Sequence, residues 1–135
     1  ILLLAVTTQF TYAQEVVTNE SIIQMKELGF DEPCFGYYYT LNGKDWKFAD
    51  NKQYDSLDEF YNIGSMFTIS APLYQQAFRW FREKYGLAHN IHPITYDCYV
   101  VNQKDPSIDD IGDFNTYEEA ELACLKKLIE IVNQN

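Results

Sequence analysis

The chain has 135 residues, a formal net charge of −10 and a hydrophobic content of 47%. This length and apolar content suit one domain with its own core and argue against a disordered chain. The acidic charge argues against direct binding of DNA or RNA, because a nonspecific nucleic-acid binder needs a positive surface to displace counterions. It suits a basic partner as well as an ordinary solvated exterior.

The first 17 residues differ from the rest of the chain. An apolar run over residues 1–6 precedes the small residues Thr11 and Ala13, an order typical of the later part of a secretory signal. The run is too short to span a bilayer, and it carries neither an initiator Met nor a basic leader. We expect a signal-like or disordered segment over residues 1–17 and a single domain over residues 18–135.

Short elements are expected in the first half of the chain. A cap at Thr18 or Asn19 predicts a short helix that ends at Gly29. The capping-box spacing of residues 56–59 predicts a helix of one or two turns. Residues 66–69 follow as a short strand or an extended lead into the next element.

A β-hairpin is predicted around Asn42-Gly43. These two residues tolerate positive φ and lie between two β-prone runs, residues 34–41 and 44–48, which is the strongest short-range hairpin signal. The first run contains three consecutive tyrosines, Tyr37 to Tyr39. Because side chains alternate across a strand, at least one of these rings points away from the core.

The stretch 70–86 predicts the central helix. Ser70 can cap its first turn, Pro72 needs no amide partner there, and Gly86 provides a left-handed stop. At about 100° per residue, the large apolar side chains share one face, which we expect to form the centre of the core. That face consists of Leu73, Tyr74, Ala77, Phe78, Phe81 and Tyr85, with Trp80 at its edge.

A strand and a helix are expected after the central helix. A loop over residues 87–93 leads into a strand over residues 94–103, and an acidic loop over residues 105–115 follows. Thr116 to Glu119 form a capping box that opens an amphipathic helix to about Val132. In this order the elements predict an α+β fold, with a small, mainly antiparallel sheet of three to four strands packed by two main helices plus short helices.

Metal sites receive little support from the residue pattern. His89 and His92, with Cys34 as a third ligand, would form an incomplete zinc set. Residues 105–116 resemble a calcium loop in composition, but Asp110 stands at the sixth position, which requires Gly. We therefore assign no metal and no cofactor.

The three cysteines are far apart in the sequence and odd in number, so no disulfide framework follows. Cys98 and Cys124 lie in apolar patterns and are interpreted as small buried hydrophobes. Cys34 with His89 or His92 matches the residue list of a thiol hydrolase, but nothing local activates it. We assign no catalytic residue and favour a protein without enzymatic activity.

Three segments form a recognisable set: residues 27–34, the sequence SAPLYQQAFRWFREKY at residues 70–85, and residues 117–130. They resemble a family of small uncharacterised proteins encoded by phages and mobile elements of gut bacteria. The likeness covers about residues 18–132, and the family has no assigned activity from which site residues could be transferred. The resemblance implies the cytoplasm of a bacterial host, whereas a genuine signal over residues 1–13 would imply a secreted or periplasmic protein.

The sequence contains 11 Tyr, 9 Phe and 2 Trp, an excess of aromatic residues that is common at protein interfaces. We expect a non-enzymatic accessory protein that binds a host or phage protein through an aromatic and acidic surface. The expected binding residues are Tyr37, Tyr38, Tyr39 and Trp46. The alternatives are tyrosines that only cover outer sheet faces, a small cysteine-dependent hydrolase, and an acidic inhibitor that imitates a nucleic acid. No transmembrane span is expected, and the oligomeric state is left open.

Overall fold

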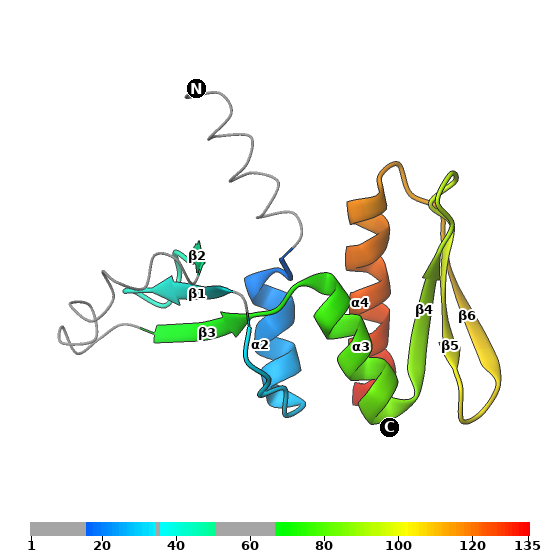
Figure 1. Ribbon diagram of the computed structural model, residues 1–135, viewed down its shortest axis with the longest axis horizontal. Coiled ribbons are helices and arrows are strands. Elements are labelled where there is room, and N and C mark those ends of the chain that lie inside the picture. The colour runs from blue at the N-terminus through cyan, green and yellow to red at the C-terminus, as the bar shows by residue number, and fades with distance from the viewer. Residues whose placement is uncertain (1–15, 35, 51–66) are drawn as a thin grey trace. The chain divides into compact units, whose positions relative to one another are not determined.

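The computed structural model describes residues 16–34, 36–50 and 67–135. The chain divides into two compact units, residues 1–73 and 74–135, and the described residues of each unit form one three-stranded antiparallel sheet (Figure 1). The α+β fold with small antiparallel sheets is therefore confirmed, although the strands form two sheets instead of one. The single domain over residues 18–135 stays a prediction, and the helix predicted at residues 56–59 lies outside the described residues.

The first sheet has β1 as its centre strand. β1 (Gly36–Thr40) pairs with β2 (Lys47–Asp50) on one side and with β3 (Phe67–Ala71) on the other, and both pairs are antiparallel. The predicted hairpin is thus confirmed, although its second strand begins at Lys47 and not at residue 44, and β3 contains residues 67–69 of the strand predicted at residues 66–69. The hairpin loop runs over residues 41–46, and Gly43 within it adopts a positive φ of 76°.

Helix α2 (Asn19–Glu27) begins at the predicted cap. The Thr18 side-chain oxygen accepts a hydrogen bond from the amide of Ser21 at 3.3 Å, and Gly29 just beyond the helix has a φ of 96°. The helix contacts β3, so it covers part of the first sheet. The core residues of this region are Val16, Val17, Ile22, Met25 and Phe30, each at most 2% exposed.

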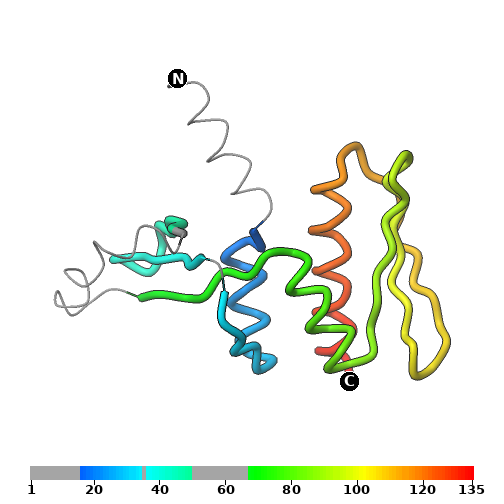
Figure 2. The backbone as a smooth tube through the Cα atoms, viewed as in Figure 1, coloured from blue at the N-terminus to red at the C-terminus, as the bar shows by residue number. Residues whose placement is uncertain are grey.

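The second unit places two helices on one face of a sheet. Helix α3 (Tyr74–Tyr85) leads into β4 (Leu87–Ile91), β5 (Cys98–Asn102) and β6 (Ser107–Gly112), and α4 (Tyr117–Gln134) follows. The strands pair antiparallel in the order β4-β5-β6. Figure 1 shows both helices on the same side of this sheet, and Figure 2 shows the backbone reversing twice to form it. The deepest side chains are Cys98, Val100, Phe81, Cys124, Leu125 and Leu128, each at most 1% exposed.

Helix α3 begins later than predicted. Ser70 belongs to β3, and the carbonyl of Pro72 accepts a hydrogen bond from the amide of Val17 at 2.9 Å, so the chain is still extended there. Proline disfavours the α conformation in the residue before it, and Ala71 therefore cannot start the helix.

The predicted end of α3 is confirmed, because Gly86 adopts a φ of 68°. The inner face is confirmed for Tyr74, Ala77, Phe78, Trp80 and Phe81, which are buried, whereas Leu73 and Tyr85 are half-buried.

Two segments predicted to be loops are strands. β4 occupies most of the loop expected over residues 87–93, and β6 lies inside the acidic loop expected over residues 105–115. The strand predicted over residues 94–103 is shorter, since residues 93–95 form a turn and Ile94 is 80% exposed. These predictions were wrong because both outer strands are fixed by pairing with β5, a partner that local sequence patterns do not reveal.

Helix α4 confirms the last predicted element. The Thr116 hydroxyl accepts a hydrogen bond from the amide of Glu119 at 3.1 Å, and the Glu119 carboxylate accepts one from the amide of Asn115 at 3.2 Å. Side chains at both positions of the capping box therefore satisfy amides at the start of the helix. The buried face consists of Ala120, Cys124, Leu125, Leu128 and Ile129.

Candidate functional site

The four predicted binding residues lie in β1 and in the loop that follows it. Tyr37 is 4% exposed, and its ring centroid lies 6.0 Å from that of Tyr39. Tyr38 points to the opposite face of the sheet, where its hydroxyl donates a hydrogen bond to the carbonyl of Val17 at 2.7 Å. Burial raises the pKa of Tyr38 to about 12. The buried Tyr37 and the hydrogen-bonded, half-buried Tyr38 thus stabilise the first unit, and Tyr39 and Trp46 are also half-buried.

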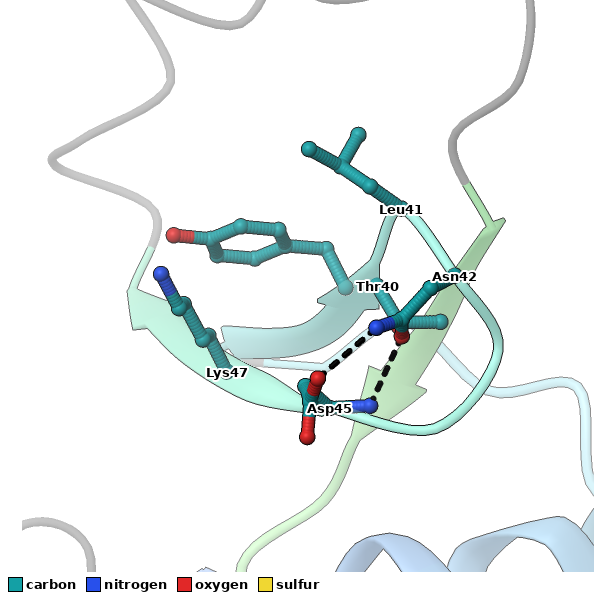
Figure 3. A pocket seen from close by; sticks show the side chains of 6 residues that line it. Thr40, Leu41, Asn42, Asp45 and Lys47 are labelled. Carbon is teal, nitrogen blue, oxygen red and sulfur yellow. Dashed lines mark hydrogen bonds between the residues drawn. The ribbon is translucent and has the colours of Figure 1, made fainter.

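The end of the β1–β2 hairpin contains a hollow of about 330 Å³ (Figure 3). It is lined by Tyr39, Thr40, Leu41, Asn42, Asp45 and Lys47. Asn42 stabilises the loop through three hydrogen bonds. Its Oδ1 accepts hydrogen bonds from the amides of Lys44 and Asp45, both at 2.9 Å, and its Nδ2 donates one to the Asp45 carboxylate at 2.7 Å. Lys47 forms no ion pair with any described residue. The polar lining mainly stabilises the loop, and the hollow contains no nucleophile next to a base.

The cysteines are not arranged as nucleophiles. The Cys34 thiol donates a hydrogen bond to the carbonyl of Glu32 at 3.3 Å, and burial raises the pKa of Cys34 to about 11 in spite of the nearby Lys26. A thiol with this pKa is almost fully protonated at neutral pH and is a poor nucleophile. Cys98 and Cys124 are fully buried, as predicted, and burial raises the pKa of both.

The two histidines have separate structural roles. His89 of β4 stacks on Phe78 of α3, with ring centroids 3.6 Å apart and ring planes inclined by 18°. Burial, assisted by the positive charge of Arg82, lowers the pKa of His89 to about 4, so the ring is neutral at pH 7. His92 Nδ1 accepts two backbone amides of the β4–β5 turn at 3.2 and 3.3 Å. Each imidazole is therefore used in packing or in turn formation.

The acidic stretch that resembles a calcium loop in composition is mostly the strand β6 and its flanks. In the part of the chain that the structure describes, no three side chains of His, Cys, Asp or Glu are grouped so that they could hold a metal ion. The aspartates of β6 instead lie along the edge of the second sheet.

The second sheet has a face that α3 and α4 do not cover. Cys98 and Val100 of β5 are buried on the helix side, so the alternating residues Tyr99 and Val101 point the other way and are half-buried. The register places Val101 between Ala88 of β4 and Ile108 of β6, and Tyr99 between Asn90 and Asp110. We call these six residues the outer face: Ala88, Asn90, Tyr99, Val101, Ile108 and Asp110.

The outer face combines an apolar row with a polar, acidic row. Ile108 is 68% exposed at the end of the apolar row, and Asp110 is exposed at the end of the row that contains Tyr99. Residues 97–113 carry five aspartates and one lysine, a net charge of −4. The surface thus offers aliphatic area, an aromatic ring and negative charge within one small sheet.

Signals for this surface were present in the sequence. Leu87, His89 and Ile91 alternate with Ala88 and Asn90, a spacing compatible with a strand, although it does not reveal β5 as the partner. The side chain of Asn102 accepts the amides of Lys104 and Asp105 at 3.0 and 3.2 Å, an Asx turn that reverses the chain into β6. The outer face was missed because the segments that contribute β4 and β6 were expected to be loops.

Comparisons with family models, curated proteins and solved structures found no match to this chain. The resemblance to small proteins of phages and mobile elements therefore stays a prediction. Within residues 16–34, 36–50 and 67–135, no helix has the length and apolar character needed to cross a bilayer.

Proposed function

We propose that the protein is a non-enzymatic accessory protein that binds a protein partner through an aromatic and acidic surface, and that this surface is the outer face of the second sheet. The observation that supports the proposal is the apolar row of the half-buried Ala88 and Val101 and the exposed Ile108, beside Tyr99 and Asp110. Interfaces combine an apolar and aromatic centre with a polar rim, and the outer face has this composition.

This proposal moves the expected contact away from the first sheet. Tyr37 is buried, and the hydroxyl of Tyr38 donates a hydrogen bond to the carbonyl of Val17. Neither ring can therefore move to contact a partner without a loss of stability. Tyr99 occupies the corresponding centre strand of the second sheet and lies on the side away from α4. An aromatic ring in this position is available without rearrangement of the core.

The charge of the outer face favours a partner with a basic surface. Asp110 lies on the outer face, and residues 97–113, which include β5, β6 and their flanks, carry a net charge of −4 that attracts Lys and Arg side chains and repels nucleic acid. A host or phage protein in the bacterial cytoplasm is the partner that we propose, with a secreted or periplasmic setting as the alternative. An acidic inhibitor that imitates a nucleic acid is the variant in which the partner is itself a DNA- or RNA-binding protein.

The proposal is tested by affinity capture from a lysate of the host bacterium with three forms of the chain. Ile108→Asp places a charge in the apolar row, and Phe67→Asp is its matched control, because both side chains are exposed strand residues, at 68% and 64%. We expect one stoichiometric protein to be captured by the natural chain and by Phe67→Asp, but lost with Ile108→Asp. Capture that is unaffected by Ile108→Asp, with the variant folded, contradicts the proposal.

A further inference from the structure

Strand β6 forms an unpaired edge of the second sheet. It is hydrogen-bonded to β5 on one side, and within the described residues no backbone hydrogen bond joins it to another strand. In an antiparallel pair, alternate residues direct their N–H and C=O groups away from the partner strand. Residues 107–110 are all exposed, so these backbone groups face solvent. An edge of this kind can accept a further strand.

The side chains of β6 restrict which strand could be added. Asp109 and Asp110 are consecutive and point to opposite faces of the sheet, so both faces of the edge are acidic. Antiparallel pairing of β6 with β6 of a second copy would bring these aspartates close to one another, and like charges on facing strands are destabilising. A strand that carries Lys or Arg is complementary instead, and Ile108 offers it an apolar contact.

We infer that β6 accepts an extended, basic segment of a partner protein as a fourth strand of the second sheet. The inference rests on the proposed function and names the element through which the partner binds. Backbone hydrogen bonds to β6 provide the main attraction, and basic side chains next to Asp109 and Asp110 provide selectivity. The outer face continues into the added strand, so a partner domain attached to the segment could also contact Tyr99 and Val101.

The test uses the full chain, labelled with ¹⁵N, and a synthetic peptide with alternating Lys and Val residues and blocked ends. We expect saturable binding, chemical-shift changes concentrated in residues 107–112, and slower hydrogen exchange at alternate amides of β6. A peptide with Pro in place of Val keeps the charge but lacks the amides needed for a strand. It should bind at least about tenfold more weakly and protect no β6 amide.

A double variant, Asp109→Asn with Asp110→Asn, tests the role of charge. It keeps the strand and its exposed edge, and we expect the affinity for the Lys-Val peptide to fall by about tenfold. Its fold is checked by circular dichroism. Three results would each overturn the inference. The first is an affinity of the Pro peptide equal to that of the Lys-Val peptide, and the second is unchanged chemical shifts and hydrogen exchange of the β6 amides with the Lys-Val peptide. The third is dimerisation of the chain through β6.

The failure of this inference is distinguishable from that of the proposed function. If capture of a partner depends on Ile108 but the Lys-Val peptide leaves the β6 amides unchanged, only the addition of a strand to β6 is excluded. The proposed function then stands. If the peptide pairs with β6 but capture does not depend on Ile108, strand addition is supported and the outer face is excluded as the surface that the partner needs.

Discussion

The two sheets of this protein have the same antiparallel pairing but use their centre strands differently. In the first sheet, β1 buries Tyr37 on one face and bonds Tyr38 to Val17 on the other. In the second sheet, β5 buries small side chains under α4 and leaves Tyr99 and Val101 on a face that the helices do not cover. Tyr37 and Tyr38 are thus structural in the first sheet, whereas Tyr99 lies on the open face of the second sheet.

The largest effect is expected from a cavity in the helix layer of the second unit. Phe81 is fully buried, and Phe81→Ala should lower the free energy of unfolding by ~3–5 kcal/mol. Arg82→Ala, at an exposed position one residue later, should change it by less than about 0.5 kcal/mol. Urea unfolding followed by circular dichroism measures both values. Equal effects of the two variants would show that α3 does not anchor this unit.

A pH dependence should distinguish the second unit from the first. The pKa of His89 falls from 6.5 to about 4 on folding, so the unfolded chain binds more protons between these values. The contribution of the neutral His89 to the free energy of unfolding is therefore fully present above about pH 6.5. It is lost progressively as the pH falls toward 4, and each unit of pKa difference is worth ~1.4 kcal/mol.

The variant His89→Phe keeps a ring against Phe78 but removes the titrating group. The difference in unfolding free energy between the natural chain and His89→Phe, measured from pH 7 to pH 4.5, isolates the histidine from the carboxylates. We expect the natural chain to lose stability faster on acidification. Parallel curves for the two proteins would exclude a His89 ring that stays neutral in the folded chain.

A close approach in the first sheet should be sensitive to one added methyl group. A Cβ at residue 36 would lie 2.5 Å from the ring of Phe48 and 2.8 Å from the backbone oxygen of Ala49. Gly36→Ala should therefore cost ~1–3 kcal/mol through overpacking. Gly43→Ala has free space around it and should cost only the strain of its positive φ, ~1–2 kcal/mol. If replacement of Phe48 by a smaller residue restores the stability of the Gly36→Ala variant, the clash is the cause of the loss.

The smallest effect is expected from single hydroxyl groups on the two centre strands. Tyr38→Phe removes the donor to the Val17 carbonyl and should cost ~0.5–1.5 kcal/mol. Tyr99→Phe, on the open side of the second sheet, should stay within about 0.5 kcal/mol of the natural chain. Thermal unfolding of the two variants compares them directly. A larger loss for Tyr99→Phe would mean that the second sheet also uses its tyrosine for structure.

Local signals in the sequence identified the ends of elements well. Thr18 and Thr116 cap helices because their side chains reach amides within one turn, and Gly86 stops α3 because it can adopt a positive φ. The start of α3 was missed because the restriction that Pro72 places on Ala71 outweighs the capping potential of Ser70.

Pairing between distant segments could not be read in the same way. Aspartates are depleted in strands, so the sequence of β6 resembles a loop until β5 lies beside it. Likewise, three tyrosines in β1 predict a strand but do not reveal that it is the centre strand, where Tyr37 becomes buried. The candidate site depends on these non-local facts, and for this reason the binding tyrosines predicted from the sequence lie on a different sheet from the residues of our proposal.

Site-specific photocrosslinking compares the two sheets most directly. The photoreactive residue p-benzoylphenylalanine replaces Tyr99 in one variant and Tyr39 in another, both of which are half-buried positions on centre strands. We expect a discrete crosslinked protein from the host lysate with the residue at position 99 and none with it at position 39. A crosslink that forms at position 39 and not at position 99 would place the binding surface on the first sheet and contradict the proposal.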